Sequence, residues 1–214
     1  MLSSPSKPRD SASLVLIRGA GRGQEVLLGR RAATARFMPG RFVFPGGVLE
    51  PEDLIPSGYP EQLPKLPEGI DGSTRQELAC FARTALRETY EESGLLLGAP
   101  YPRPAASKQG LWATYAERRL LPAFGALTLF AQAITPSSYP IRFHARFFLA
   151  EGQLAQGSPI SHGELEAVAW VPLGQVQALP LPSVTRDVLR KALALRAMGR
   201  PGAALKRLRA WRFA

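Results

Sequence analysis

Three glutamates share one short stretch of this chain, Arg87-Glu88-Thr89-Tyr90-Glu91-Glu92-Ser93-Gly94. This stretch lies at the end of a longer segment, residues 74–93, which is rich in helix formers and contains neither proline nor glycine. Ser73 is placed to cap the start of a helix and Gly94 to end it. On that helix Glu88, Glu91 and Glu92 stand at i, i+3 and i+4, so their carboxylates share one face.

Three like charges on one helix face repel one another, and the negative end of the helix dipole adds to the repulsion. One interpretation is an exposed acidic patch. The other is a site for a hard cation such as Mg²⁺, which binds carboxylate oxygens readily. Arg87 could hold one carboxylate in place, and the upstream Pro45-Gly46-Gly47 turn could supply backbone groups.

These residues resemble the Nudix hydrolase family, whose box reads G-x5-E-x7-R-E-U-x-E-E-x-G-U. Its halves are similar to residues 46–53 and 87–95 of this chain. The resemblance implies that Glu88, Glu91 and Glu92 bind Mg²⁺ or Mn²⁺, with the Gly47 carbonyl as a further ligand. It also implies that Arg87 orients a glutamate.

The chain departs from the box between its two halves. Asp53 stands where the pattern has its first glutamate, and 33 residues separate it from Arg87 where the pattern has seven. The excess coincides with the proline-rich residues 51–72, which we expect to form a surface insertion. The coenzyme A diphosphatase subgroup of the family carries such an insertion. Tyr90 is aromatic where the pattern has an aliphatic residue.

A second stretch, residues 27–47, resembles the coenzyme A variant of the family, L-L-T-x-R-[SA]-x3-R-x3-G-x3-F-P-G-G, and departs from it only at Gly29. Arg31 and Arg36 offer planar donors suited to phosphate groups. The alternative is that they serve solubility or pair with Glu50 or Glu52. The predicted substrate-binding residues are Arg31, Arg36, Gly40, Phe44 and Gly46.

Metal-assisted hydrolysis of a diphosphate also needs a base that accepts a proton from water. The resemblance places a late glutamate of this kind before the end of a strand at residues 170–172. The predicted catalytic residues are Arg87, Glu88, Glu91, Glu92 and Glu164, and the further candidates for the base are Glu166, His144 and His162.

The remaining pattern predicts an α/β fold. The expected strands are residues 13–17, 25–29, 41–44, 127–134, 143–150 and 167–171, and the further helices are 108–120, 183–198 and 202–211. Strands and helices interleave without strict alternation, which indicates a mixed sheet covered on both sides. With the family resemblance, the expected fold is a Nudix-type α/β/α sandwich.

The length of 214 residues favours one domain. We expect a flexible N-terminus at residues 1–12, a hydrolase domain at 13–182 and basic helices at 183–214. Residues 184–214 hold nine Lys or Arg and one acid, so +8 of the net charge of +10 lies there. A solvated helical face is the simpler interpretation of this tail, and a nucleic-acid contact is the alternative.

The composition restricts the class of protein. Cys80 is the single cysteine, which excludes an internal disulfide and favours a reducing, cytoplasmic setting. No apolar run approaches the ~20 residues needed to span a membrane. The sequence is compatible with a homodimer.

Three functions follow as hypotheses. The first is hydrolysis of coenzyme A or acyl-coenzyme A to adenosine 3′,5′-bisphosphate and phosphopantetheine or its acyl derivative. The second is hydrolysis of another small nucleotide substrate, such as ADP-ribose or a dinucleotide cofactor. The third is a non-catalytic domain that senses nucleotides or binds nucleic acid.

Overall fold

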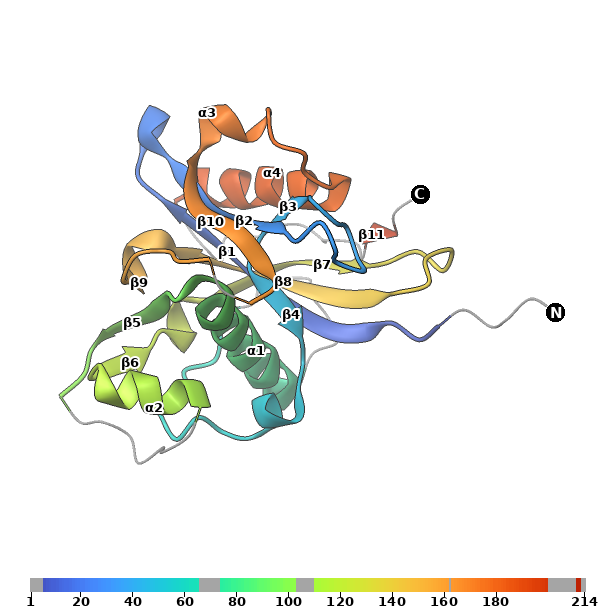
Figure 1. The fold of residues 1–214 in the computed structure, drawn as a ribbon. Helices are drawn as coiled ribbons and strands as arrows, with labels where there is room; N and C mark the ends of the chain where they lie inside the picture. Colours follow the sequence, from blue (N-terminus) through green and yellow to red (C-terminus); the bar gives the residue numbers. More distant parts are fainter. Residues whose placement is uncertain (1–5, 66–73, 103–109, 162, 200–210, 213–214) are drawn as a thin grey trace.

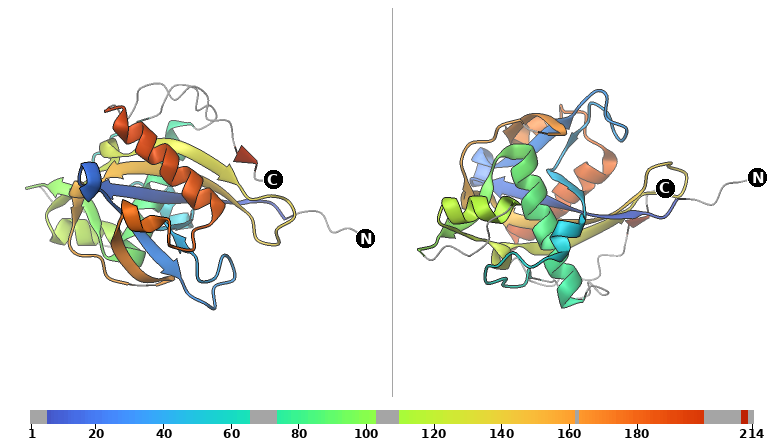
Figure 2. Two further views of the ribbon diagram at one scale, coloured as in Figure 1. Left: turned by 90° about the horizontal axis from the view of Figure 1, so that it is seen from above. Right: turned by 60° about the horizontal axis from the view of Figure 1, so that its bottom comes forward.

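The computed structural model describes residues 6–65, 74–102, 110–161 and 163–199, and the backbone of 211–212. A mixed sheet lies between helices, with α1 on one face and α3 and α4 on the other (Figures 1 and 2). This α/β/α sandwich confirms the expected fold class. None of the helices among these residues is long and apolar enough to cross a bilayer.

The helices are α1 (Arg75–Ser93), α2 (Gly110–Glu117), α3 (Leu173–Val176) and α4 (Ser183–Ala197), with 3-10 turns η1 (Gly21–Gly23), η2 (Pro51–Leu54), η3 (Phe124–Ala126) and η4 (Gly152–Leu154). The strands are β1 (Arg9–Arg18), β2 (Glu25–Arg31), β3 (Phe42–Val43), β4 (Gly46–Val48), β5 (Leu96–Pro100), β6 (Leu120–Pro122), β7 (Thr128–Ile134), β8 (Phe143–Glu151), β9 (Ala155–Gln156), β10 (Leu165–Pro172) and β11 (Trp211–Arg212).

Strand β1 is central to the main sheet, whose order is β10-β2-β1-β8-β7-β11. It runs parallel to β8 along its length and antiparallel to β2 and β4. On one edge β1 changes partner, from β2 at Ile17 and Arg18 to β4 at residues 11–13. This change of partner places Gly46 and Gly47, the start of β4, against the central strand of the sheet.

Alternation along β1 separates two hydrophobic cores. Leu14 and Leu16 pack toward α1, whereas Val15 and Ile17 pack toward α4. Helix α1 fills the first core with one apolar stripe, formed by Leu78, Phe81, Ala82, Ala85 and Leu86. Burial of this stripe fixes the rotation of α1 about its axis and so sets which face carries the glutamates.

Helix α1 begins one residue later than predicted, because Thr74 and not Ser73 caps it. The Thr74 hydroxyl accepts from the Glu77 N–H at 3.2 Å, and the Glu77 carboxylate accepts from the Thr74 N–H at 2.7 Å. Ser73 itself lies outside the described residues. Gly94 ends the helix in the left-handed conformation with φ 71°, as predicted.

Two corrections concern the ends of the chain. Residues 9–12 belong to β1 and not to a flexible terminus, because their backbone pairs with β8 from Arg9↔Phe143 onward. The predicted helix at 202–211 lies outside the described residues except at Trp211, which forms a strand with Arg212. This strand, β11, pairs with β7 at Ala133 and Ile134 and so covers the edge of β7 that faces away from β8.

Two further helix predictions can be compared with the structure. Residues 183–197 form α4, in agreement with the prediction for 183–198. The helix predicted at 108–120 is observed as α2, Gly110–Glu117, and residues 108–109 lie outside the described part. Leu120 pairs with β5 and belongs to β6, so the predicted helix ran too far.

The insertion starts as the short turn η2 and then passes α1, where Glu61 pairs with Arg83. Its described part returns to the main fold at Lys65, which forms a bridge to Thr128. Tyr59 from this segment is buried beside Tyr115 and Tyr101. The described part of the insertion is therefore packed on the molecule, which the sequence pattern alone did not indicate.

Candidate active site

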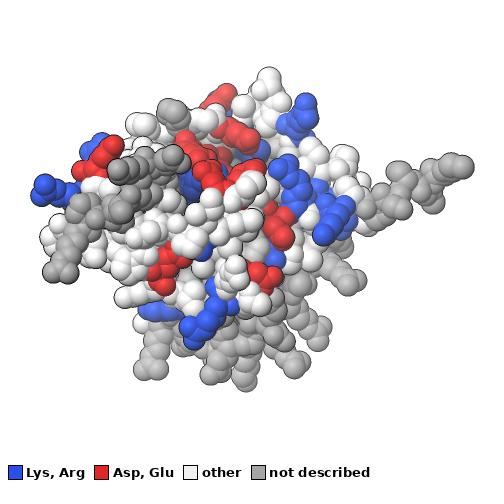
Figure 3. Space-filling model, turned by 90° about the horizontal axis from the view of Figure 1, so that it is seen from below, with Lys and Arg blue, Asp and Glu red and all other residues white. Residues whose placement is uncertain are grey.

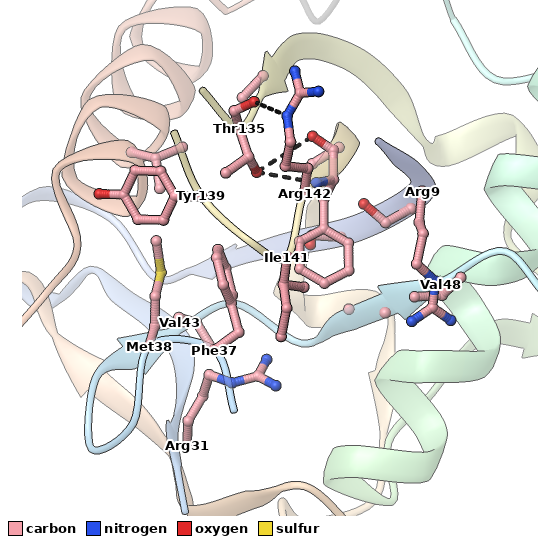
Figure 4. A pocket seen from close by; sticks show the side chains of 18 of the residues that line it. Arg9, Arg31, Phe37, Met38, Val43, Val48, Thr135, Tyr139, Ile141 and Arg142 are labelled. Carbon is pink, nitrogen blue, oxygen red and sulfur yellow. Dashed lines mark hydrogen bonds between the residues drawn. The ribbon is translucent and has the colours of Figure 1, made fainter. Parts of the chain in front are cut away.

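A pocket of about 1320 Å³ opens on the α4 side of the sheet. Its floor is formed by β1, β4, β7 and β8, and its walls by the loop at 32–41, the hairpin at 135–142 and the start of α4. Figure 4 shows the arginines and apolar side chains that face this space. Its size would accommodate an extended nucleotide substrate.

Among the α1 glutamates, Glu88 lines the pocket beside Gly46 and Gly47 of β4. Glu92 is 4% exposed and accepts a hydrogen bond from the Gly46 N–H at 2.8 Å. Glu88 lies against Gly47 so closely that an added Cβ would overlap its carboxylate. Glycine at position 47 therefore provides the space in which the Glu88 carboxylate and the turn backbone meet.

Arg87 links the two halves of the predicted motif. Its guanidinium donates to Asp53 Oδ1 at 3.0 Å and to Asp53 Oδ2 at 2.8 Å, and both side chains are buried. Further contacts of Arg87 are to Val48 O at 3.0 Å, Glu88 Oε1 at 3.0 Å and Glu91 Oε2 at 2.9 Å. One buried arginine thus holds two glutamates of α1 and the β4 backbone in register.

Burial dominates the ionisation of this cluster. It raises the pKa of Glu88 to about 7, with Glu91 adding to the shift and Arg87 opposing it. It raises the pKa of Glu92 to about 8, against the Gly46 hydrogen bond. For Arg87, burial alone would lower the pKa, but the bonds to Asp53 and the charge of Glu88 outweigh it and leave the pKa raised.

Glu92→Gln is expected to stabilise the metal-free protein at high pH. The pKa of Glu92 is raised to about 8 by burial, so its contribution to stability is present below the unfolded pKa and is lost as pH rises through 8. Glutamine keeps an oxygen for the Gly46 N–H and cannot ionise. The variant should exceed the wild type by less than about 1 kcal/mol near about pH 5 and by about 4 kcal/mol near about pH 8.5.

Urea unfolding in EDTA at several pH values measures this difference. Added Mg²⁺ should reverse its sign, because a bound cation favours the ionised carboxylate. A difference that does not vary with pH would contradict the assigned burial of the Glu92 charge.

The predicted substrate-binding residues are placed as follows. Arg31, Arg36, Phe44 and Gly46 line the pocket. Gly40 does not belong to its lining, because its N–H donates to the Arg31 carbonyl at 3.1 Å and closes the loop between β2 and β3.

Glu164 lines the pocket at the start of β10. Its carboxylate accepts from Arg31 Nη2 at 2.9 Å, and its side chain is 74% exposed. The buried Nε of Arg31 has no hydrogen-bond partner among the described residues. Arg31 and a glutamate that is open to solvent therefore meet at the pocket.

The remaining predicted residues lie around the pocket and not in its lining. Glu91 is half-exposed and turned to Arg87, and Glu92 lies behind the turn. The other candidates for the catalytic base also lie outside the pocket lining. Glu166 pairs with Arg30 at 3.1 Å, and His144 contacts Gln132 at 3.1 Å. His162 lies outside the described residues.

Sequence reasoning missed a basic and aromatic part of the lining. It includes Lys7, Arg9, Arg142, Phe37 and Phe143, and the last two rings meet edge to face at 5.0 Å (Figure 4). One signal was available in the sequence, because Arg9, Ser11 and Ser13 alternate at the start of a strand whose later residues, 14–17, are apolar. The aromatic part comes from hairpin and loop positions for which no such signal exists.

The residues at the turn fit a divalent cation. Glu88, Glu92 and the Gly47 backbone offer hard oxygen donors in one place, and the missing side chain of Gly47 leaves the space between them. In the described part of the chain, no three acidic or imidazole groups already converge as a complete metal site. Arg87 instead holds Glu88 and Glu91.

Comparison with known proteins identifies the family. No protein-family model matches the chain. The crystal structure of a Nudix hydrolase from Alicyclobacillus acidocaldarius is 32% identical and has a TM-score of 0.69, covering 94% of this chain and 99% of its own. The chain belongs to the Nudix hydrolase family.

Two curated relatives are also similar in sequence. The acyl-coenzyme A diphosphatase NUDT19 of Gallus gallus is 34% identical over 128 residues, which are 45% of this chain and 34% of that protein. A Caenorhabditis elegans protein named as a nudix hydrolase is 30% identical over 161 residues, 66% of this chain and 43% of its own length. The matches therefore span less than half of either relative.

A more distant structure shares the Nudix fold alone. The Nudix domain of Shewanella oneidensis NrtR, crystallised with ADP-ribose, is 16% identical with a TM-score of 0.51 and covers 88% of both chains.

The Nudix box of this chain is split in sequence and closed in space. Asp53 from the first half pairs with Arg87 from the second, and Gly46 donates to Glu92. The inserted residues begin after Asp53 and contact α1 where Glu61 pairs with Arg83. Figure 3 shows that acidic side chains gather between basic ones on the face of the molecule seen from below. The insertion therefore does not separate the two parts of the motif.

Proposed function

We propose that this Nudix hydrolase cleaves the diphosphate bond of coenzyme A or acyl-coenzyme A, yielding adenosine 3′,5′-bisphosphate and phosphopantetheine or its acyl derivative. One observation carries the proposal: Glu88, which brings a carboxylate, and Arg31, which brings a guanidinium, line the same pocket. A diphosphate needs both an anchor for a cation and donors for its oxygens. The likeness to the chicken diphosphatase adds support for the substrate.

Mg²⁺ or Mn²⁺ would be held by Glu88, Glu91, Glu92 and the Gly47 carbonyl. When bound, the metal would lower the pKa of a water molecule and neutralise charge on the phosphate. Arg87 orients Glu88 and Glu91 through its contacts at 3.0 and 2.9 Å. Glu88 or the exposed Glu164 accepts the proton from water, since both face the pocket.

The substrate is held by the basic and aromatic lining. Arg31 and Arg36 donate to phosphate oxygens on the β2–β3 side, and Gly46 of β4 lies in the same pocket lining. Phe44 closes the floor, and Gly40 shapes the loop that carries both arginines. Arg9 enters from the opposite side of the pocket, beside Val48 (Figure 4).

The direct test incubates the purified protein with Mg²⁺ and coenzyme A and identifies the products by mass spectrometry. Release of adenosine 3′,5′-bisphosphate is expected, and EDTA should abolish it. A parallel panel contains acetyl-coenzyme A, ADP-ribose and NADH. If coenzyme A stays intact while ADP-ribose or NADH is hydrolysed, the proposal is wrong and the hydrolysed nucleotide is the substrate.

Arg31→Lys is expected to raise KM for coenzyme A by roughly tenfold to a hundredfold, because lysine keeps the charge and loses the planar pair of donors. The kcat should change less, since Arg31 is a binding residue in this proposal. Steady-state kinetics with saturating Mg²⁺ measure both constants.

Arg30→Lys is the matched control. Arg30 is the neighbour on β2 and pairs with exposed Glu166 on the other side of the strand, outside the pocket lining. Its KM should equal that of the wild type. Equal KM values for both variants would remove Arg31 from the binding site.

A further inference from the structure

The insertion is attached to α1 by an ion pair that is largely shielded from water. Arg83 of α1 is 4% exposed, and its Nε and Nη2 donate to the two carboxylate oxygens of Glu61 at 3.1 Å each. The Glu61 side chain is 16% exposed and also accepts from the Ser57 N–H at 2.7 Å. Both ends of the pair are therefore held in one geometry.

The same arginine touches the first half of the Nudix box. Arg83 Nη1 donates to the backbone carbonyl of Asp53. The carboxylate of Asp53, 2% exposed, accepts from Arg87 and also from the Thr84 hydroxyl at 3.0 Å. Asp53 is thus held from two sides, by Arg83 at its backbone and by Arg87 at its side chain.

These contacts form one continuous path. It runs from Glu61 through Arg83 and Asp53 to Arg87, and from there to Glu88 and Glu91. Arg83 and Arg87 are four residues apart on α1 and so project from the same side of the helix. The insertion and the carboxylates of the active site are therefore joined through two neighbouring guanidinium groups.

The charge of Glu61 is part of this arrangement. Burial alone would raise the pKa of Glu61, but the hydrogen bonds from Arg83 and Ser57 outweigh burial and leave the pKa lowered. Without the Glu61 carboxylate, Arg83 would keep only its bonds to the Asp53 carbonyl and to Cys80 Sγ among the described residues. Without the Glu61 carboxylate, the buried guanidinium would turn toward other acceptors and displace Asp53, whose carbonyl it binds.

We propose that Glu61 is a positioning residue for the active site. Through Arg83 it fixes Asp53, and Asp53 in turn fixes the guanidinium of Arg87 that orients Glu88 and Glu91. The residues that split the box thereby help to complete the site. This inference rests on the proposed function for the roles of Glu88 and Glu91.

Glu61→Gln tests the proposal with two measurements on the full-length protein. The first is Mn²⁺ affinity, measured by electron paramagnetic resonance at a temperature where circular dichroism shows the variant to be folded. The second is kcat and KM for coenzyme A. We expect Mn²⁺ affinity to fall by roughly tenfold to a hundredfold and kcat to fall with little change in KM, as for other groups that orient metal ligands.

Glu151→Gln is the matched control. Glu151 of β8 also forms a two-pronged pair, with Arg196 of α4 at 2.9 and 2.8 Å, on the opposite side of the sheet from α1. This control should retain the wild-type Mn²⁺ affinity and kcat. Glu61→Gln with a lowered melting temperature but unchanged Mn²⁺ affinity and kcat would overturn the proposal and leave the pair a purely structural one.

Two provisions keep the test decisive. If Glu61→Gln does not fold, Glu61→Asp keeps the charge and withdraws it from Arg83 by one methylene, and the same two outcomes apply with smaller changes. If the wild type hydrolyses no coenzyme A, the proposed substrate is wrong, and the Mn²⁺ affinities of wild type, variant and control still decide the role of Glu61.

Discussion

Glu88→Gln is expected to lower kcat for diphosphate hydrolysis by about 10³-fold, within the range for loss of a proton-transfer group or a metal ligand. Glu88 is the α1 carboxylate that lines the pocket and lies against Gly47. Glutamine has nearly the same shape but cannot carry the negative charge. The effect should therefore appear in kcat with Mg²⁺ present, while the melting temperature of the metal-free protein stays the same or rises.

Glu52→Gln is the control for this variant. Glu52 also lies near Arg87, with Oε1 at 3.5 Å from Nε, but its side chain is 60% exposed and does not line the pocket. Its kcat should equal that of the wild type. If the Glu88→Gln variant retains kcat to within about tenfold, another carboxylate carries the chemistry. Glu164 would then be the next residue to substitute.

Arg87→Met is expected to reduce the free energy of unfolding by about 3–5 kcal/mol, because removing one partner of a buried ion pair leaves the other charge unpaired. The charge left behind is that of Asp53, which is 2% exposed. The β4 carbonyl of Val48 loses a donor as well. Urea unfolding in EDTA measures this loss without interference from bound metal.

Two further variants make the comparison specific. Asp53→Asn combined with Arg87→Met should recover part of the loss, because the double variant buries no isolated carboxylate. Arg190→Met removes an exposed i,i+3 pair with Asp187, whose arginine side chain is 70% exposed, and should cost at most about 1 kcal/mol. Equal losses for Arg87→Met and Arg190→Met would contradict the assigned burial of the Arg87–Asp53 pair.

Local pattern was sufficient for much of the fold. The helix that ends at Gly94 could be predicted because its apolar stripe, its composition and its left-handed end are properties of neighbouring residues. Strands β7 and β8 follow from their β-branched and aromatic content. The start of β1 could not be found in this way, because Arg9 to Ser11 are polar and are ordered by pairing with β8, which lies far along the chain.

The residues of the candidate site likewise include some that local pattern predicts and some that it does not. Glu88, Glu91 and Glu92 could be predicted because they share one helix, where spacing alone sets their common face. Phe37 and Arg142 could not, since their arrival at the same pocket depends on how the 32–41 loop and the 135–142 hairpin pack. Gly40 matches a sequence pattern and stays a prediction as a substrate contact: it lies outside the pocket lining, and its N–H bonds within the loop.

The amino-acid order thus specifies the carboxylate face of α1, the Gly46-Gly47 turn and the family to which both belong, because these depend on spacing within single segments. Tertiary structure alone decides that Asp53 meets Arg87 across the inserted residues and that Glu61 meets Arg83 beside them. Such pairs join residues more than twenty positions apart. Their formation depends on burial in a folded core, where an unpaired charge is costly, and no local pattern records which distant charge will be the partner.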